Sequence, residues 1–267
     1  MKKDKILLLT TDLNNIEAYK KEGLNNFLFA LKGYSIGYNS FLFDEIKDID
    51  ANVYILMNRL LTDTDIDEFL KLDIPKNVKG FIIEDIGLLE VIDKKYKVII
   101  FENHLNNNYE TINIMLEDAD SLVISNDITL DEIETILSKT NKNLVLFAFG
   151  KQMVMYSRRY LVTNYLKEYD YDIKHELLVT EKVSGKEFYL KENEYGTAIF
   201  NNKYLDYRNN LQKIDDNKIM HYIIDTSNLS SKDVIDIINM KPFENVTDGF
   251  MHKNTVYKVG DLDDWTT

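Results

Sequence analysis

The chain has 267 residues, with 45 acidic side chains, 32 Lys and Arg, no cysteine and a formal net charge of -13. Its length suits one large domain or two small ones, and a single α/β barrel commonly falls in this range. The surplus of negative charge argues against tight non-specific binding of nucleic acid by the whole surface. The lack of cysteine excludes a disulfide, a thiol nucleophile and a thiolate-bound zinc or iron–sulfur centre.

The chain has no apolar run of about 18 residues, the length that a membrane-spanning helix needs. The basic start, MKKDK, precedes only about five apolar residues, which is too short for a signal peptide. We therefore expect a cytoplasmic protein with no membrane partner.

Short runs of aliphatic, β-branched and aromatic residues recur along the first 150 residues. The runs predict seven strands: Ile6–Thr10, Asn26–Leu31, Val53–Met57, Lys79–Ile83, Lys97–Phe101, Ser121–Ile124 and Asn143–Ala148. An eighth, His221–Ile224, follows much later. Strands that are apolar on both faces and alternate with helices are typical of a parallel sheet covered by helices.

Helical patterning fills the gaps between these strands. The predicted helices are Asn15–Glu22, Phe41–Ile49 capped by Ser40, Asp65–Lys71, Ile86–Asp93, Tyr109–Glu117, Thr129–Ser138 with a capping box, and Lys232–Met240 capped by Ser230. This order predicts a (β/α)8 TIM-like barrel, as a single domain over residues 1–267. An open doubly wound sheet is the alternative, but the chain has no Gly-rich nucleotide-binding motif to support it.

The long gap between strands seven and eight predicts an insertion over residues 151–218. It is expected to begin with an amphipathic helix, Tyr156–Lys167, and to continue with β-structure. The predicted strands are His175–Val183, Glu187–Leu190 and Glu194–Asn201, with a hairpin turn at Ser184-Gly185. In a barrel, such an insertion would roof the mouth formed by the carboxyl ends of the strands.

Polar residues follow most of the predicted strands, where a barrel places its chemistry. Glu84, Glu102 and His104 are the catalytic candidates, because carboxylates and an imidazole suit acid–base work. The ligand-binding candidates are Asn58, Arg59, Lys151 and Arg159. Arg159 would lie about two turns into the helix after strand seven, so its side chain would have to reach back to the mouth.

Simpler structural roles compete with these functional ones. Asp12, Asp85 and Ser125 are suited to cap helices or form turns. Arg59 can pair with a neighbouring acid, and His104 can lie in a solvated loop. The four His are scattered and show no paired spacing, so we expect neither a metal nor another cofactor.

Several stretches resemble the peptidase U-32 family of collagenase-like proteases, a family also linked to RNA and quinone hydroxylation. The strongest is Asn143–Tyr165, a strand, a Gly and then a Met-Tyr-Ser-x-Arg segment. Ser121–Ile136, Lys79–Leu89, Glu194–Asn202 and Asp248–Phe250 match further elements in the same order. The resemblance spans roughly residues 50–255 and implies the family's barrel fold.

The chain departs from the family at its cysteines. Aligned on Gly150, two of them fall on Met153 and Tyr160, and the family's His falls on Phe149. In hydroxylating members these cysteines are thought to hold an iron–sulfur cluster, so the resemblance carries the fold over without that chemistry.

The resemblance implies an accessory or atypical subunit in tRNA wobble-uridine hydroxylation. Its expected partners are a cysteine-bearing paralogue and tRNA, held through a local patch, with no DNA partner. One alternative is a peptidase of unassigned catalytic type, which would be a hydrolase. Another is a stand-alone barrel that binds a small anion with Lys151 and Arg159.

Overall fold

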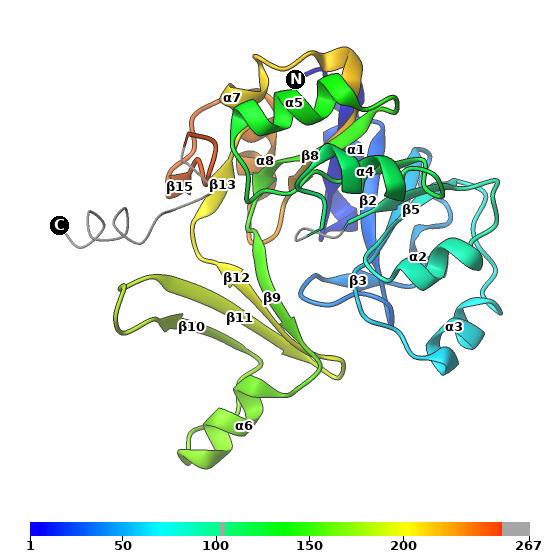
Figure 1. Cartoon of the computed structure of the whole chain (residues 1–267). Helices are drawn as coiled ribbons and strands as arrows, with labels where there is room; N and C mark the ends of the chain where they lie inside the picture. Colours follow the sequence, from blue (N-terminus) through cyan, green and yellow to red (C-terminus); the bar gives the residue numbers. More distant parts are fainter. Residues whose placement is uncertain (102–104, 253–267) are drawn as a thin grey trace.

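The main sheet of the molecule is curled and mostly parallel. The structure, a computed structural model, describes residues 1–101 and 105–252. Eleven strands form this sheet, in the order β15-β13-β8-β14-β1-β2-β4-β5-β6-β7, with β3 (Ser40–Phe41) paired to β2 (Figure 1). Every neighbouring pair is parallel except β8 with β13.

All eight predicted strands are present in this sheet. They are β1 (Ile6–Leu9), β2 (Asn26–Leu31), β4 (Asn52–Met57), β5 (Val78–Ile83), β6 (Lys97–Ile100), β7 (Ser121–Leu122), β8 (Leu144–Gly150) and β14 (Ile219–Asp225). Just past β7, Val123 bridges to Val145 of β8, and the Ile124 amide donates to the Val145 carbonyl at 2.9 Å. The architecture is therefore a mixed α/β fold that is compatible with the predicted TIM-like barrel.

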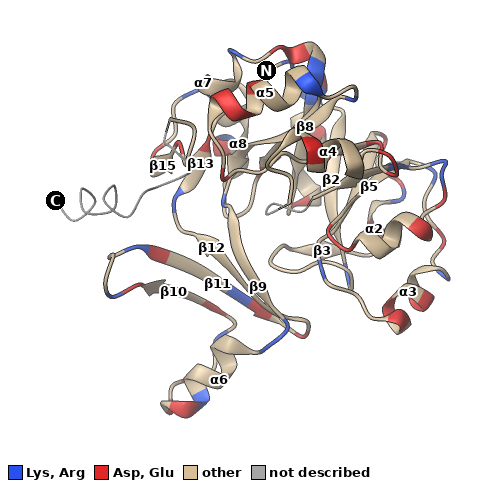
Figure 2. Cartoon of the chain, in the orientation of Figure 1, with Lys and Arg blue, Asp and Glu red and all other residues tan. Residues whose placement is uncertain are grey.

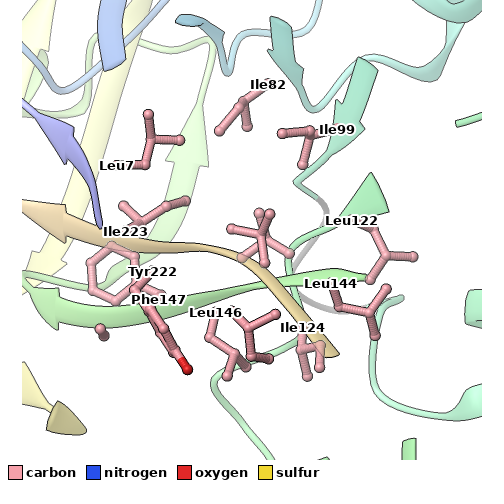
Figure 3. Packing of buried hydrophobic residues seen from close by; sticks show 14 of the residues in the cluster. Leu7, Ile82, Ile99, Leu122, Ile124, Leu144, Leu146, Phe147, Tyr222 and Ile223 are labelled. Atoms are coloured by element: carbon pink, nitrogen blue, oxygen red, sulfur yellow. The ribbon is translucent and has the colours of Figure 1, made fainter. Parts of the chain in front are cut away.

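Alternate residues of β1, β2 and β4 feed two apolar cores, one on each face of the sheet. Leu7 and Leu9 belong to one core, and Ile6 and Leu8 belong to the other. Figure 3 shows the first core, where side chains from β1, β5, β6, β7, β8 and β14 meet. This burial on both faces is why the strands are apolar throughout.

Helices and short turns connect the strands. They are η1 (Lys3–Lys5), η2 (Leu13–Asn15), α1 (Ile16–Lys21), α2 (Phe43–Ile46), α3 (Asp63–Phe69), η3 (Ile86–Glu90), α4 (Tyr109–Met115), α5 (Leu130–Lys139) and α8 (Ser231–Ile238). The capping box predicted at Thr129 is confirmed. The cap predicted at Ser40 is wrong, because the backbone there pairs with β2 and α2 begins only at Phe43.

A second sheet lies between β8 and β14 in the sequence. Its antiparallel strands are β9 (Met153–Ser157), β10 (Glu176–Thr180), β11 (Glu187–Asn193) and β12 (Gly196–Asn201), in the order β10-β11-β12-β9. The rest of this stretch holds α6 (Leu161–Glu168), β13 (Tyr204–Asp206), α7 (Arg208–Leu211) and η4 (Asp216–Lys218). β13 also pairs with β15 (Val246–Thr247).

The predicted helix over residues 156–167 is wrong over its first five residues. Tyr156 and Ser157 belong to β9, because their backbone pairs with Ala198 and Thr197 of β12. The helix itself begins at Leu161. Residues 153–157 thus form one edge of the second sheet.

Charged residues lie on helices, turns and the second sheet, while the central strands of the main sheet have very few (Figure 2). Within the described residues, we find no helix with the length and apolar character to span a bilayer.

Candidate functional site

A pocket of about 290 Å³ opens where the strands of the main sheet end, with β9 as its other wall. We call it the mouth pocket. Its lining residues are Tyr38, Asn58, Leu60, Glu84, Phe101, Asn126, Phe147, Gln152, Met153, Val154, Met155 and Tyr156. The carboxyl ends of parallel strands are the usual place for chemistry in barrel folds, so this pocket is the candidate site.

Asn58 is buried at the end of β4, and its side chain holds a loop. Its amide oxygen accepts from the Ile36 amide, and its Nδ2 donates to the Ile36 carbonyl, both at 3.1 Å. The Asn58 side chain therefore makes the same two hydrogen bonds to Ile36 that the backbone of a neighbouring strand would make. This fixes the loop that carries Tyr38 into the mouth pocket.

Arg59 is buried, and its positive charge is balanced by an acidic side chain of the same chain. Its Nη2 lies 2.5 Å from Asp65 Oδ1, and its guanidinium stacks 4.2 Å from the centre of the Tyr195 ring. Burial acts to raise the pKa of Asp65, but hydrogen bonds from Thr62 and the charge of Arg59 outweigh it and lower that pKa. The simpler role of Arg59, pairing with a neighbouring acid, is confirmed.

Glu84 lies directly after β5 and lines the mouth pocket, as the sequence predicted. Its backbone amide donates to the Met57 carbonyl at 3.1 Å, which extends the pairing of β5 with β4. The other two catalytic candidates, Glu102 and His104, lie outside the described residues.

Lys151 and Asp225 form a buried charged cluster beside the mouth pocket. Lys151 Nζ donates to Asn202 Oδ1 at 3.2 Å and lies 4.7 Å and 5.3 Å from the ring centres of Tyr189 and Tyr204. Burial lowers the pKa of Lys151, and Asp225 opposes that shift. Burial also raises the pKa of Asp225, at the end of β14, to about 6. Both ammonium and carboxylate are thus costly to keep charged here.

Gly150 permits the close packing of β8 against β14 at this cluster. Its φ is +143°, and a Cβ at this position would lie 2.4 Å from Asp225 Cβ and 2.9 Å from Phe147 Cζ. Only glycine fits such a backbone and such an approach.

Arg159 does not lie where the sequence predicted. It occupies an exposed turn between β9 and α6, and it is not among the residues that line the mouth pocket. Its carbonyl accepts from Thr197 Oγ1 at 2.9 Å, so its backbone helps to join β9 to β12. Arg159 lies in a turn and not in a helix because residues 153–157 form β9 and α6 begins only at Leu161.

The predicted capping roles are confirmed. Asp12 accepts from the Asn14 amide, and Asp85 accepts from the Gly87 and Leu61 amides. Ser125 Oγ accepts from the Asp127 amide at 3.1 Å. In residues 1–101 and 105–252 there is no group of three His, Asp or Glu arranged to hold a metal ion.

Sequence reasoning missed Tyr38 and the β9 residues of the pocket. Tyr38 is buried, and its ring lies 5.6 Å from that of Phe200 on β12. Burial, followed by the charges of Asp225 and Glu84, raises the pKa of Tyr38 well above its usual value. Its position in the loop after β2, where a barrel places pocket residues, is the feature of the sequence that points to it.

The sequence model of Peptidase family U32 matches residues 40–263. The chain belongs to peptidase family U32. This agrees with the resemblance in the Asn143–Tyr165 segment, which forms β8, β9 and the start of α6. No curated protein matches the chain.

Two solved structures are similar at 11% identity. The U32 peptidase Mk0906 gives a TM-score of 0.48, with 84% of this chain and 93% of that chain covered. The C-terminal domain of a putative chitinase from Desulfitobacterium hafniense gives 0.38, with 89% and 99% covered. Neither likeness is close enough to support a functional argument.

Proposed function

We propose that this U32 chain is a cytoplasmic accessory subunit in tRNA wobble-uridine hydroxylation. In this role the mouth pocket receives a base, and a cysteine-bearing paralogue supplies the oxidative chemistry. Membership of the family together with the complete lack of cysteine supports this division of labour.

The observation that carries the proposal is the lining of the mouth pocket. Aromatic rings from Tyr38, Phe101, Phe147 and Tyr156 share it with the amides of Asn126 and Gln152. Aromatic faces and amide groups are what proteins use to stack an unpaired base and to bind its polar edge. A volume of about 290 Å³ is at the small end for ligand pockets, which suits a base better than a peptide.

The charges near the pocket favour a neutral ligand over an anion. Glu84 lines the pocket, Arg59 is paired with Asp65, and Arg159 lies elsewhere. Lys151 is buried between two tyrosine rings. The alternative of a stand-alone anion-binding barrel therefore has less support than a base-binding pocket whose phosphates stay outside.

We also propose where the domain begins and ends, how the barrel closes and which segment covers the pocket. We take residues 1–267 as one barrel domain, closed where β7 meets β8 at the Val123–Val145 bridge. Residues 151–218 then act as a roof whose β9 strand completes the pocket.

The test is an affinity pull-down of the tagged full chain from native lysate, read by mass spectrometry and RNA sequencing. We expect a cysteine-bearing U32 protein and tRNA. Leu60 is 53% exposed and lines the pocket, so Leu60→Trp should block it and lose tRNA while retaining the protein partner.

Leu42→Trp is the matched control, because Leu42 is 51% exposed and is not among the lining residues. It should keep both tRNA and the partner. Absence of both from the wild-type sample would contradict the proposal, as would equal tRNA recovery with L60W.

A further inference from the structure

The second sheet turns one face towards the main sheet and the other face away from it. Phe200, Ala198 and Met153 lie on the inner face, within 3.0 Å of where a Cβ on Gly37 would stand. Side chains on a strand alternate between faces, so the neighbours of these residues in β12 point outward.

The outward side chains form a continuous apolar surface. The strand register pairs Leu177 with Leu190, Leu190 with Ile199, and Ile199 with Met155, which makes one row across all four strands. Val179 and Phe188 pair in the next row. We call these six residues the outer patch: Met155, Leu177, Val179, Phe188, Leu190 and Ile199.

The described part of the chain leaves the outer patch partly uncovered. Met155 is 43% exposed and Val179 37%, and the other four residues are partly exposed. None of the six belongs to either core or packs against one as a partly buried residue. By contrast, inward-facing Met153 and Tyr189 do pack against a core.

Helix α6 packs against β11 and β12 on this face, where its Val162 and Leu166 are buried. There Glu192 accepts hydrogen bonds from the Val162 and Thr163 amides at 2.9 Å and from Thr197 Oγ1 at 2.6 Å. The carboxylate of Glu192 is thus buried under the helix. The solvated face of an antiparallel sheet is usually polar, so an apolar outer face that stays partly uncovered suits a partner.

Charge on the outer face permits self-association in a chain of net charge -13. The outer patch contains no charged residue. At the hairpin end the Glu181 amide donates to the Lys186 carbonyl, so the sheet pairing places an acid opposite a base. This rim is self-complementary, because Glu181 of one copy can meet Lys186 of another across a twofold axis.

We propose that the outer patch is a homodimer interface, in which a second copy of this chain packs the same face against it. Two apolar sheets stack about 10 Å apart with aligned strands, which fits two copies of a four-stranded sheet. The proposal does not depend on the pocket's ligand, because five of the six residues lie outside the lining of the mouth pocket and only Met155 is shared with it.

Sedimentation equilibrium of the untagged full chain tests this directly. At about 100 µM we expect an average mass approaching twice 31.3 kDa, since a dimer with a Kd near 10 µM would be mostly assembled. Leu190→Lys places a charge in the middle row and should weaken the dimer at least tenfold. Val179→Lys, at a more exposed position, should have the same direction of effect with less risk to folding.

Ile114→Lys is the matched control, since Ile114 is a 66% exposed residue on α4 and should leave the dimer intact. Circular dichroism verifies that each variant is folded. A monomeric wild-type chain at about 100 µM would overturn the proposal. So would a dimer that persists in both L190K and V179K, or a monomer whose outer patch instead holds another protein.

Discussion

The strands β8 and β11 show how differently the two sheets use their sequence. All seven residues of β8 are buried, whereas β11 has a single buried residue, Glu192. In the main sheet, apolar character follows from two cores that need it. In the second sheet, apolar residues remain on an open face. Burial therefore explains the fold of the first region, and for the second we propose that a second copy of the chain completes the packing.

Replacing one phenylalanine of each sheet by alanine should give the largest difference in the free energy of unfolding between the two regions. Phe81 of β5 is fully buried and contacts the rings of Phe69 and Tyr96. Phe81→Ala should lower the free energy of unfolding by about 3–5 kcal/mol. Phe188→Ala, on the outer patch, should cost less than half of that. Urea denaturation of both variants measures the difference, and equal losses would break the comparison.

The second largest difference in stability is expected when one glycine of each sheet is replaced by alanine. Gly150→Ala would force a Cβ into Asp225 at a φ of +143°, so we expect a loss of about 3 kcal/mol. Gly185, in the hairpin of the second sheet, has a φ of +69° and no atom within 4 Å of a built Cβ. Gly185→Ala should cost about 1 kcal/mol, from backbone strain alone. Thermal unfolding of the pair should reveal this gap, and a G150A chain as stable as G185A would argue against tight packing at β14.

The buried carboxyl of Asp225 should give the main sheet a pH signature. Its pKa in the folded chain is about 6, above the usual value of about 4, so the folded state binds this proton more tightly. The proton's contribution to stability is present at low pH and is lost as pH rises from about 4 to 6.

Asp225→Asn removes this titration while other carboxyls titrate equally in both chains. The wild-type free energy of unfolding minus that of D225N should fall by at most about 3 kcal/mol across this window. Urea unfolding at four pH values measures it. A difference in the free energy of unfolding that stays flat from about pH 4 to 6, the range set by these two pKa values, would show that Asp225 is not desolvated.

The sequence predicted the main sheet well because its strands are apolar on both faces. It predicted local caps such as Asp85 and Thr129 for a similar reason, since these depend on residues close in the chain. It failed at residues 156–157, where the pattern also fits a helix and pairing with residues 197–198 decides.

The candidate site was predicted only in part. Asn58 and Glu84 do line the mouth pocket, since each directly follows a buried strand. The structural role of Arg59 depends on Tyr195, which is remote in sequence. Tyr38 and Gln152 enter the pocket from a loop and from the start of the second sheet, and such contacts have no local sequence pattern.

Direct binding of RNA tests the central claim, that the mouth pocket receives a base. Two fluorescent anticodon hairpins, identical except for uridine or cytidine at the wobble position, would be titrated with the purified chain and its co-purified partner. We predict tighter binding of the uridine hairpin, at least a tenfold loss in L60W and no change in L42W. Equal affinity for both hairpins, or full uridine preference in L60W, would contradict the account.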